Sequence, residues 1–201
     1  MMKPIQFWFD FSSPYAYIAS EQIEVLAAKH NRVVDWRVVM IGAVFKNAGT
    51  GPLTTRYPPL AQYAKHDFAR SARFCNVPYT LPDPFPILSQ NTARALLWMQ
   101  AHAPAHATSF LHAAFQGLFV HNAPINNSAW IEKAVNACGA NGTAAVAACS
   151  DSAIKDQLKA HTDEAIAQGI FGVPWIVADG ETFWGNDRLP QLDAWLQKGR
   201  F

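Results

Sequence analysis

Hydrophobic and polar positions nearly alternate at the start of the chain, where residues 5–11 are rich in aromatic side chains, as is typical of a strand. Ser13 and Pro14 follow, and a serine before a proline is a common beginning of a helix, because proline is tolerated in the first helical turn. Apolar residues at helical spacing continue to Ala27, and residues 33–41 form a second, β-branched run. The pattern predicts a βαβ unit whose two parallel strands are connected in the right-handed sense.

The middle of the chain has a different period. From residue 58 to about residue 168, apolar residues recur every three to four positions, which indicates helices. Clusters of proline and asparagine at 78–86 and 122–127 separate the predicted helices. About five helices are expected between the second strand and the next strand signal.

Strand-like sequence returns near the C-terminal end. Residues 175–178 and 181–184 flank Asp179 and Gly180, a typical two-residue hairpin turn. Apolar residues between 189 and 196 then have the spacing of a final amphipathic helix.

The order βαβ, helical segment, ββα predicts an α/β protein, namely a thioredoxin-like domain with a large all-α inserted domain. We expect residues 1–57 and 169–201 to form the thioredoxin-like domain, and residues 58–168 to form the inserted helical domain. With 201 residues, half of them hydrophobic, the chain can bury about 70% of the surface that its unfolded form exposes.

The charges exclude some classes of partner. The 16 lysine and arginine residues nearly balance the 15 aspartate and glutamate residues, so no field of one sign would attract nucleic acid or a membrane surface. No stretch approaches the roughly 18 consecutive apolar residues of a membrane span. The first ten residues lack the features of a secretory signal, so a soluble, cytoplasmic protein is expected.

The cysteines and histidines give no sign of a redox pair or a metal site. Cys75, Cys138 and Cys149 form no C-x-x-C motif and lack the spacing of metal ligands. A bridge between Cys138 and Cys149 stays open as an alternative, but three reduced thiols are expected in the cytosol. His102 and His106 are four residues apart with a proline between them, and no metal site is expected.

Ser12 and Ser13 occupy the junction of the first predicted strand and helix. In a parallel sheet this junction lies at the edge where ligands bind, and a helix N-terminus favours an anion. A hydroxyl there can donate a hydrogen bond to a thiolate and lower the pKa of a thiol from its usual value near 8.5. Local sequence alone favours the simpler interpretation, in which either serine only caps the helix.

Two other segments have both a structural and a functional interpretation. Val173 precedes Pro174 at a strand start, where a cis peptide bond would turn the Val173 backbone toward a peptide-like ligand, although spacing alone favours an ordinary trans proline. Asn186 and Asp187 precede the last helix, where such residues usually serve as caps. They are also suited to hold the charged ends of a small ligand.

Five segments in the same order resemble the 2-hydroxychromene-2-carboxylate isomerases, relatives of the kappa-class glutathione transferases and of disulfide oxidoreductases of the DsbA type. The resemblance covers nearly the whole chain. The segments are residues 9–15, 42–46, 91–92, 162–174 and 184–189.

The resemblance implies glutathione as cofactor and a homodimer that converts 2-hydroxychromene-2-carboxylate, or a related aromatic ring-cleavage product, to trans-o-hydroxybenzylidenepyruvate. Ser13 corresponds to the residue that hydrogen-bonds the glutathione sulfur. Val173 and Pro174 correspond to the segment that pairs with the cysteinyl unit, and Asn186 and Asp187 to the residues that hold the γ-glutamyl end.

The resemblance also implies that Lys46 and Asn91 face the second, aromatic substrate. Thr50 is expected among the glutathione contacts, but relatives commonly carry an asparagine at this position, and Leu60 replaces a basic residue. Trp175 is also bulky for the family.

These departures leave two alternatives: a kappa-like glutathione transferase or peroxidase, and a non-catalytic binder of glutathione or an aromatic acid. A disulfide oxidoreductase is disfavoured, because neither position 12 nor position 13 is a cysteine.

Overall fold

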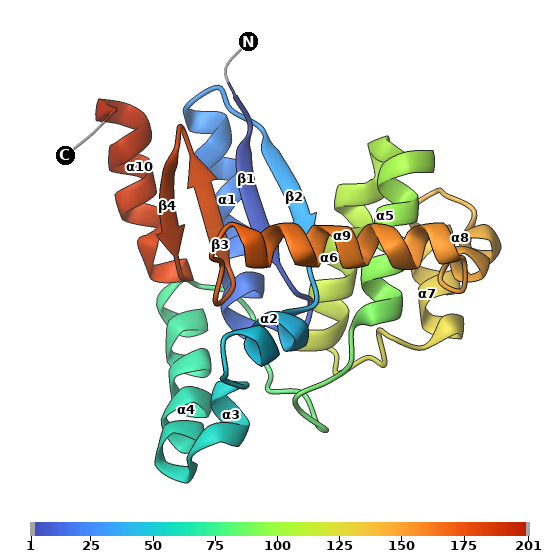
Figure 1. The fold of residues 1–201 in the computed structure, drawn as a ribbon, viewed down its shortest axis with the longest axis horizontal. Coiled ribbons are helices and arrows are strands. Elements are labelled where there is room, and N and C mark those ends of the chain that lie inside the picture. Colours follow the sequence, from blue (N-terminus) through green and yellow to red (C-terminus); the bar gives the residue numbers. More distant parts are fainter. Residues whose placement is uncertain (1–2, 200–201) are drawn as a thin grey trace.

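The computed structural model describes residues 3–199, which contain one four-stranded sheet in the order β2-β1-β3-β4 (Figure 1). β1 (Ile5–Phe9) pairs in parallel with β2 (Val34–Val38) and antiparallel with β3 (Trp175–Ala178), which forms a hairpin with β4 (Glu181–Trp184). Asp179, in the hairpin turn, has a positive φ of 53°, as such a turn requires. The predicted βαβ unit and C-terminal hairpin are both confirmed.

Helices cover both faces of the sheet. α1 (Pro14–Lys29) lies against one face with α10 (Leu189–Lys198) beside it, and α9 (Ser152–Ala167) crosses the other face (Figure 1). On the α9 side, the buried ring of Trp8 belongs to an apolar cluster that includes Ala165 of α9. The helix start predicted at Ser13 and Pro14 is also confirmed.

Eight helices connect β2 to β3 in the described chain, so the expectation of about five is wrong. Five of the eight have ten or more residues. The other three have only four to seven residues, too few to repeat an apolar stripe. The eight are α2 (Ile41–Asn47), α3 (Leu53–Arg56), α4 (Pro58–Phe74), α5 (Gln90–His102), α6 (Pro104–Phe119), α7 (Ser128–Ala137), α8 (Gly142–Ala148) and α9.

One hydrophobic core joins the sheet to the helical segment. The ring of Phe115 on α6 lies with its centroid 5.5 Å from that of Phe9 and 5.0 Å from that of Phe11. The ring of Tyr17 on α1 stacks on Phe119 at 5.2 Å. All five rings are fully buried. The division into two domains stays a prediction, and the packing indicates that any such domains would share this core.

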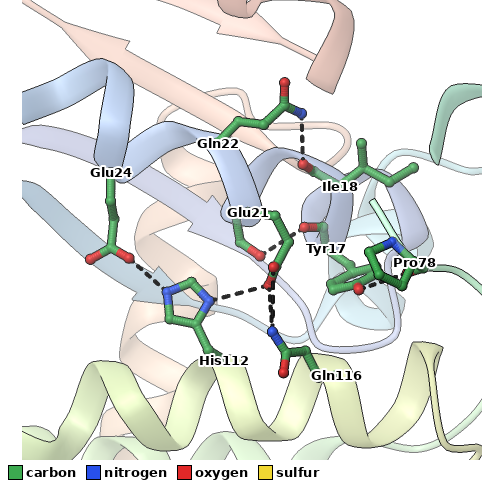
Figure 2. Close-up of polar contacts among 9 residues, drawn as sticks. Tyr17, Ile18, Glu21, Gln22, Glu24, Pro78, His112 and Gln116 are labelled. Atoms are coloured by element: carbon green, nitrogen blue, oxygen red, sulfur yellow. Dashed lines mark hydrogen bonds and ion pairs between the residues drawn. The ribbon is translucent and has the colours of Figure 1, made fainter. Parts of the chain in front are cut away.

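A polar cluster also links α1 to α6 (Figure 2). His112 of α6 lies between two glutamates of α1, with Nε2 2.7 Å from Glu24 Oε2 and Nδ1 3.5 Å from Glu21 Oε1. The Gln116 amide donates to Glu21. Burial of His112 opposes protonation, but its hydrogen bonds to both glutamates outweigh this effect and raise its pKa. The hydrogen bond to His112 in turn lowers the pKa of Glu21.

The stability of the protein should therefore fall as pH rises through the His112 transition. A raised folded-state pKa means that the stabilisation is complete below the unfolded value near 6.5 and is lost above the folded value. As pH rises through this window, the free energy of unfolding of the wild type should fall by about 1 kcal/mol more than that of His112→Gln. Urea unfolding from mildly acidic to mildly alkaline pH measures it. His66→Gln, at an exposed histidine, is the control. A difference in unfolding free energy between wild type and His112→Gln that does not change with pH would contradict the prediction.

Candidate active site

The Ser13 hydroxyl lies at the N-terminal end of α1 and contacts a distant part of the chain. Ser13 Oγ accepts a hydrogen bond from Ala16 N at 3.2 Å, as a helix cap does. It also donates to the carbonyl oxygen of Val173, 160 residues away, at 3.3 Å. Ser13 is partly exposed. The hydroxyl thus both caps the helix and takes part in a junction between the two ends of the chain.

The segment around Pro174 brings further predicted residues to this junction. The Val173–Pro174 peptide bond is cis, so the trans alternative favoured by spacing is wrong. The Pro174 carbonyl accepts a hydrogen bond from Gly185 N at 3.0 Å, and Gly185 has a φ of 109°, a conformation that favours glycine. The short helix η1 (Asn186–Arg188) begins directly afterwards and contacts α1.

A polar cluster surrounds Tyr15, which lies two residues after Ser13. The Tyr15 hydroxyl donates to Asp67 of α4 at 2.6 Å, and Arg70 forms an ion pair with the same carboxylate. Burial, the Asp67 hydrogen bond and the nearby Asp187 all raise the pKa of Tyr15. Burial opposes ionisation of Asp67, but the bonds from Tyr15 and Arg70 lower its pKa overall. Burial and the two carboxylates therefore keep the Tyr15 phenol neutral. The sequence contained no local signal for Asp67.

Aromatic side chains form an exposed patch around Val173. The ring of Phe171 meets Trp175 at 5.1 Å and Trp184 at 4.7 Å, both edge to face. Phe171 is 44% exposed and Trp184 is 52% exposed. A Cβ at Gly172 would lie 2.6 Å from Trp184 Nε1, so the indole covers the glycine backbone directly. We call these three rings the aromatic patch.

Three other predicted site residues make no hydrogen bond to Ser13. Lys46 is exposed on α2 and forms no ion pair with any residue in 3–199. The Asn91 side chain bonds Arg94 and Asn126 within the helical segment. Thr50 Oγ1 is buried without a hydrogen-bond partner. The roles assigned to Lys46, Asn91 and Thr50 stay predictions.

Ser13 does not line the cavity of about 430 Å³ that lies between α3 and α4. Thr54, Tyr57 and Lys65 are among the residues that line this cavity. We therefore identify the candidate site by the convergence of side chains around Ser13.

Two of the three cysteine thiols are poorly suited to nucleophilic chemistry. All three cysteines are free thiols, which confirms the prediction of unpaired cysteines. Burial raises the pKa of both Cys138 and Cys149 and so disfavours their thiolates. No group of three or more metal-binding side chains gathers in residues 3–199. In the same range, no helix has the length and hydropathy of a membrane span.

Comparison with known proteins gives several similar chains. A 2-hydroxychromene-2-carboxylate isomerase of Sphingobium xenophagum is 27% identical over 197 residues, which cover 98% of this chain and 99% of the relative. Glutathione S-transferase kappa 2 of Caenorhabditis elegans is 26% identical over 206 residues, covering 96% of this chain and 92% of the relative.

A solved structure of a 2-hydroxychromene-2-carboxylate isomerase superposes with a TM-score of 0.87 at 23% identity, covering 98% of this chain and 95% of that one. This likeness supports the thioredoxin-like α/β fold with its helical insertion. The model of the DSBA-like thioredoxin domain matches residues 4–197, nearly the full length. The chain therefore belongs to the family of DSBA-like thioredoxin domains.

Proposed function

We propose that this protein is a glutathione-dependent enzyme that isomerises 2-hydroxychromene-2-carboxylate, or a related aromatic ring-cleavage product, to trans-o-hydroxybenzylidenepyruvate. The observation that carries the proposal is the Ser13 hydroxyl at the start of α1, 3.3 Å from the Val173 carbonyl. The similarity to a 2-hydroxychromene-2-carboxylate isomerase supports this reaction, and the similarity to a kappa glutathione transferase supports the use of glutathione.

The residues around Ser13 fit a glutathione thiolate. The Ser13 hydroxyl can turn its hydrogen from the Val173 carbonyl to a sulfur anion, and the N-terminal end of α1 adds a favourable field. Desolvation raises the pKa of the Cys138 and Cys149 thiols, so neither readily supplies that anion. When bound, glutathione supplies a thiolate that can add reversibly to a conjugated double bond, around which rotation is otherwise blocked.

Other residues of this chain would orient the two substrates. The Val173 backbone would pair with the cysteinyl unit, while Asn186 and Asp187 would hold the γ-glutamyl end. Asp187 is exposed and pairs with Arg188 at 3.0 Å, and its carboxylate also matches the charge of an ammonium group. The free ammonium of Lys46 would bind the carboxylate of the aromatic substrate.

The direct test is conversion of the chromene carboxylate, followed by its change in absorbance, with and without glutathione. We expect turnover only when glutathione is present, and calorimetry should detect glutathione binding to the protein alone. Glutathione binding without conversion of any aromatic enone would instead support the non-catalytic binder. Turnover that does not depend on glutathione would contradict the proposal.

A kappa-like transferase is the second candidate, and the 26% identity to a kappa enzyme favours it specifically. Assays with chlorodinitrobenzene and with a hydroperoxide measure conjugation and peroxide reduction. A higher kcat/KM in either assay than in the isomerisation assay would support the transferase.

The aromatic patch predicts how the second substrate is held. We expect Phe171→Ala to raise KM for the aromatic substrate about fivefold while leaving glutathione binding unchanged, because one aromatic contact contributes about 1 kcal/mol. Steady-state kinetics and calorimetry measure the two effects. Phe74→Ala, at an 87% exposed ring at the end of α4, is the matched control. Equal KM values for the aromatic substrate in Phe171→Ala and Phe74→Ala would show that the aromatic patch does not bind this substrate.

A further inference from the structure

Asp10, the first residue after β1, carries a buried carboxylate with three hydrogen-bond donors. It is 1% exposed. Its Oδ1 accepts from Ser12 N at 2.8 Å and from Ser89 Oγ at 2.7 Å, and its Oδ2 accepts from Ile41 N at 2.9 Å. Within residues 3–199 it forms no ion pair. A buried carboxylate is costly unless it is hydrogen-bonded, and these three bonds offset that cost. Because the donors come from different directions along the chain, they also hold the carboxylate in one orientation.

The three donors come from three separate elements. Ser12 lies in the turn that leads to Ser13, Ile41 is the first residue of α2, and Ser89 precedes α5. Met40, at the cap position of α2, has no capping side chain, so Asp10 supplies that cap from 31 residues away. α2 donates the N–H of its first residue to this carboxylate, and the other two bonds come from residues that lie just before α1 and α5, so Asp10 anchors the starts of three helices.

The backbone of Asp10 also holds the turn. Its carbonyl oxygen accepts a hydrogen bond from Ser13 N at 3.0 Å, so Asp10 binds both Ser12 and Ser13. α2 carries Lys46, and α5 carries Asn91. Every helix that bears a predicted catalytic or substrate-binding residue is therefore tied to Asp10.

We propose that Asp10 is a positioning residue that aims the Ser13 hydroxyl and aligns α2 and α5 with it, an inference that rests on the proposed glutathione chemistry at Ser13. The geometry that carries it is the bond of one buried carboxylate to the Ser13 turn, to α2 and to α5. Asp10 acts through Ser12 and Ser13, and it does not touch the reacting atoms.

Removing the Asp10 charge has two effects of opposite sign on the pKa of the bound thiol. A negative carboxylate near a thiolate disfavours the anion, so loss of the charge alone would lower the thiol pKa. Loss of positioning would weaken the hydrogen bond from Ser13 to the thiolate and so would raise the thiol pKa. The sign of the shift therefore distinguishes the two roles.

The test is Asp10→Asn, which keeps the shape but turns an amide N–H₂ toward at least one of the donors. We expect the pKa of enzyme-bound glutathione, read from the ultraviolet absorbance of its thiolate, to rise, and kcat/KM to fall about tenfold. An unchanged or lowered thiol pKa overturns the proposal. Should this variant not fold, Asp10→Glu keeps the charge but moves the carboxylate, and the same rise is expected.

Ser89→Ala is the matched control, because it removes one donor from the same carboxylate without changing the Ser13 turn. We expect it to lower thermal stability and to leave the thiol pKa unchanged. A rise in Ser89→Ala equal to that in Asp10→Asn would overturn the specific link from Asp10 to Ser13.

A readout that needs no glutathione separates this inference from the proposed function. Absence of glutathione binding by wild type contradicts the proposed function, whatever Asp10 does. Amide hydrogen exchange then still tests the positioning: we expect Ser12 N and Ile41 N to exchange at least about tenfold faster in Asp10→Asn than in wild type. Unchanged exchange at both amides overturns the positioning role.

Discussion

Ser13→Ala is expected to lower glutathione-dependent kcat/KM at neutral pH by about 100-fold. The hydroxyl is the donor available to the sulfur at the start of α1, and loss of one such donor to a reacting anion typically costs a factor of this size. Steady-state rates at saturating aromatic substrate measure the effect. Because Ser13 stabilises an anion, the deficit should narrow as pH rises past the free thiol pKa near 8.5.

The control for Ser13→Ala must account for its second role as a helix cap. The substitution also removes the bond from Ala16 N, which costs about 1 kcal/mol of stability. Asn127→Ala removes an equivalent cap from α7, whose Asn127 side chain accepts from Ala129 N and Trp130 N. We expect both variants to lose similar stability but only Ser13→Ala to lose activity. Full activity in Ser13→Ala would exclude Ser13 from the mechanism.

Local patterns were sufficient to predict the elements that frame the site. Aromatic alternation identified β1, Ser13 before Pro14 marked the start of α1, and Asp179 with Gly180 marked the hairpin. Each of these signals depends on a few neighbouring residues, so it can be recognised in the sequence before the packing of the chain is known.

The contacts that assemble the site span distances along the chain that no periodicity encodes. Ser13 meets Val173 across 160 residues, Asp10 meets Ser89 across 79, and Tyr15 meets Asp67 across 52. The approach of Ser13 to Val173 was expected only through the family resemblance. The other two contacts were missed, because aspartates on a strand end and on a helix carry no local mark of their partners.

The short helices were missed for a related reason. α2 and α8 have seven residues and α3 has four, so each offers at most two turns of pattern. Helices of this length gain their stability from packing rather than from propensity. The start of α2 is a clear example, because its cap comes from Asp10 on another element.

Phe115→Ala is expected to cause the largest loss of stability, because this ring joins the helical segment to the sheet. Its centroid lies 5.5 Å from Phe9 and 5.9 Å from Tyr17, and the side chain is fully buried. Truncating such a ring costs about 3–5 kcal/mol, which for this chain length lowers Tm by about 6–20 °C. Phe74→Ala, at the exposed end of α4, should change stability by less than about 0.5 kcal/mol.

The form of the unfolding transition tests whether the predicted domains are independent. Since one core contains residues from the sheet and from α6, Phe115→Ala should move a single cooperative transition, seen equally by far-ultraviolet circular dichroism and by tryptophan fluorescence. Two separate transitions, of which only one moves, would mean that the helical segment folds on its own. The candidate site would then depend on docking between two units, since Tyr15 on α1 donates a hydrogen bond to Asp67 on α4 of the insertion.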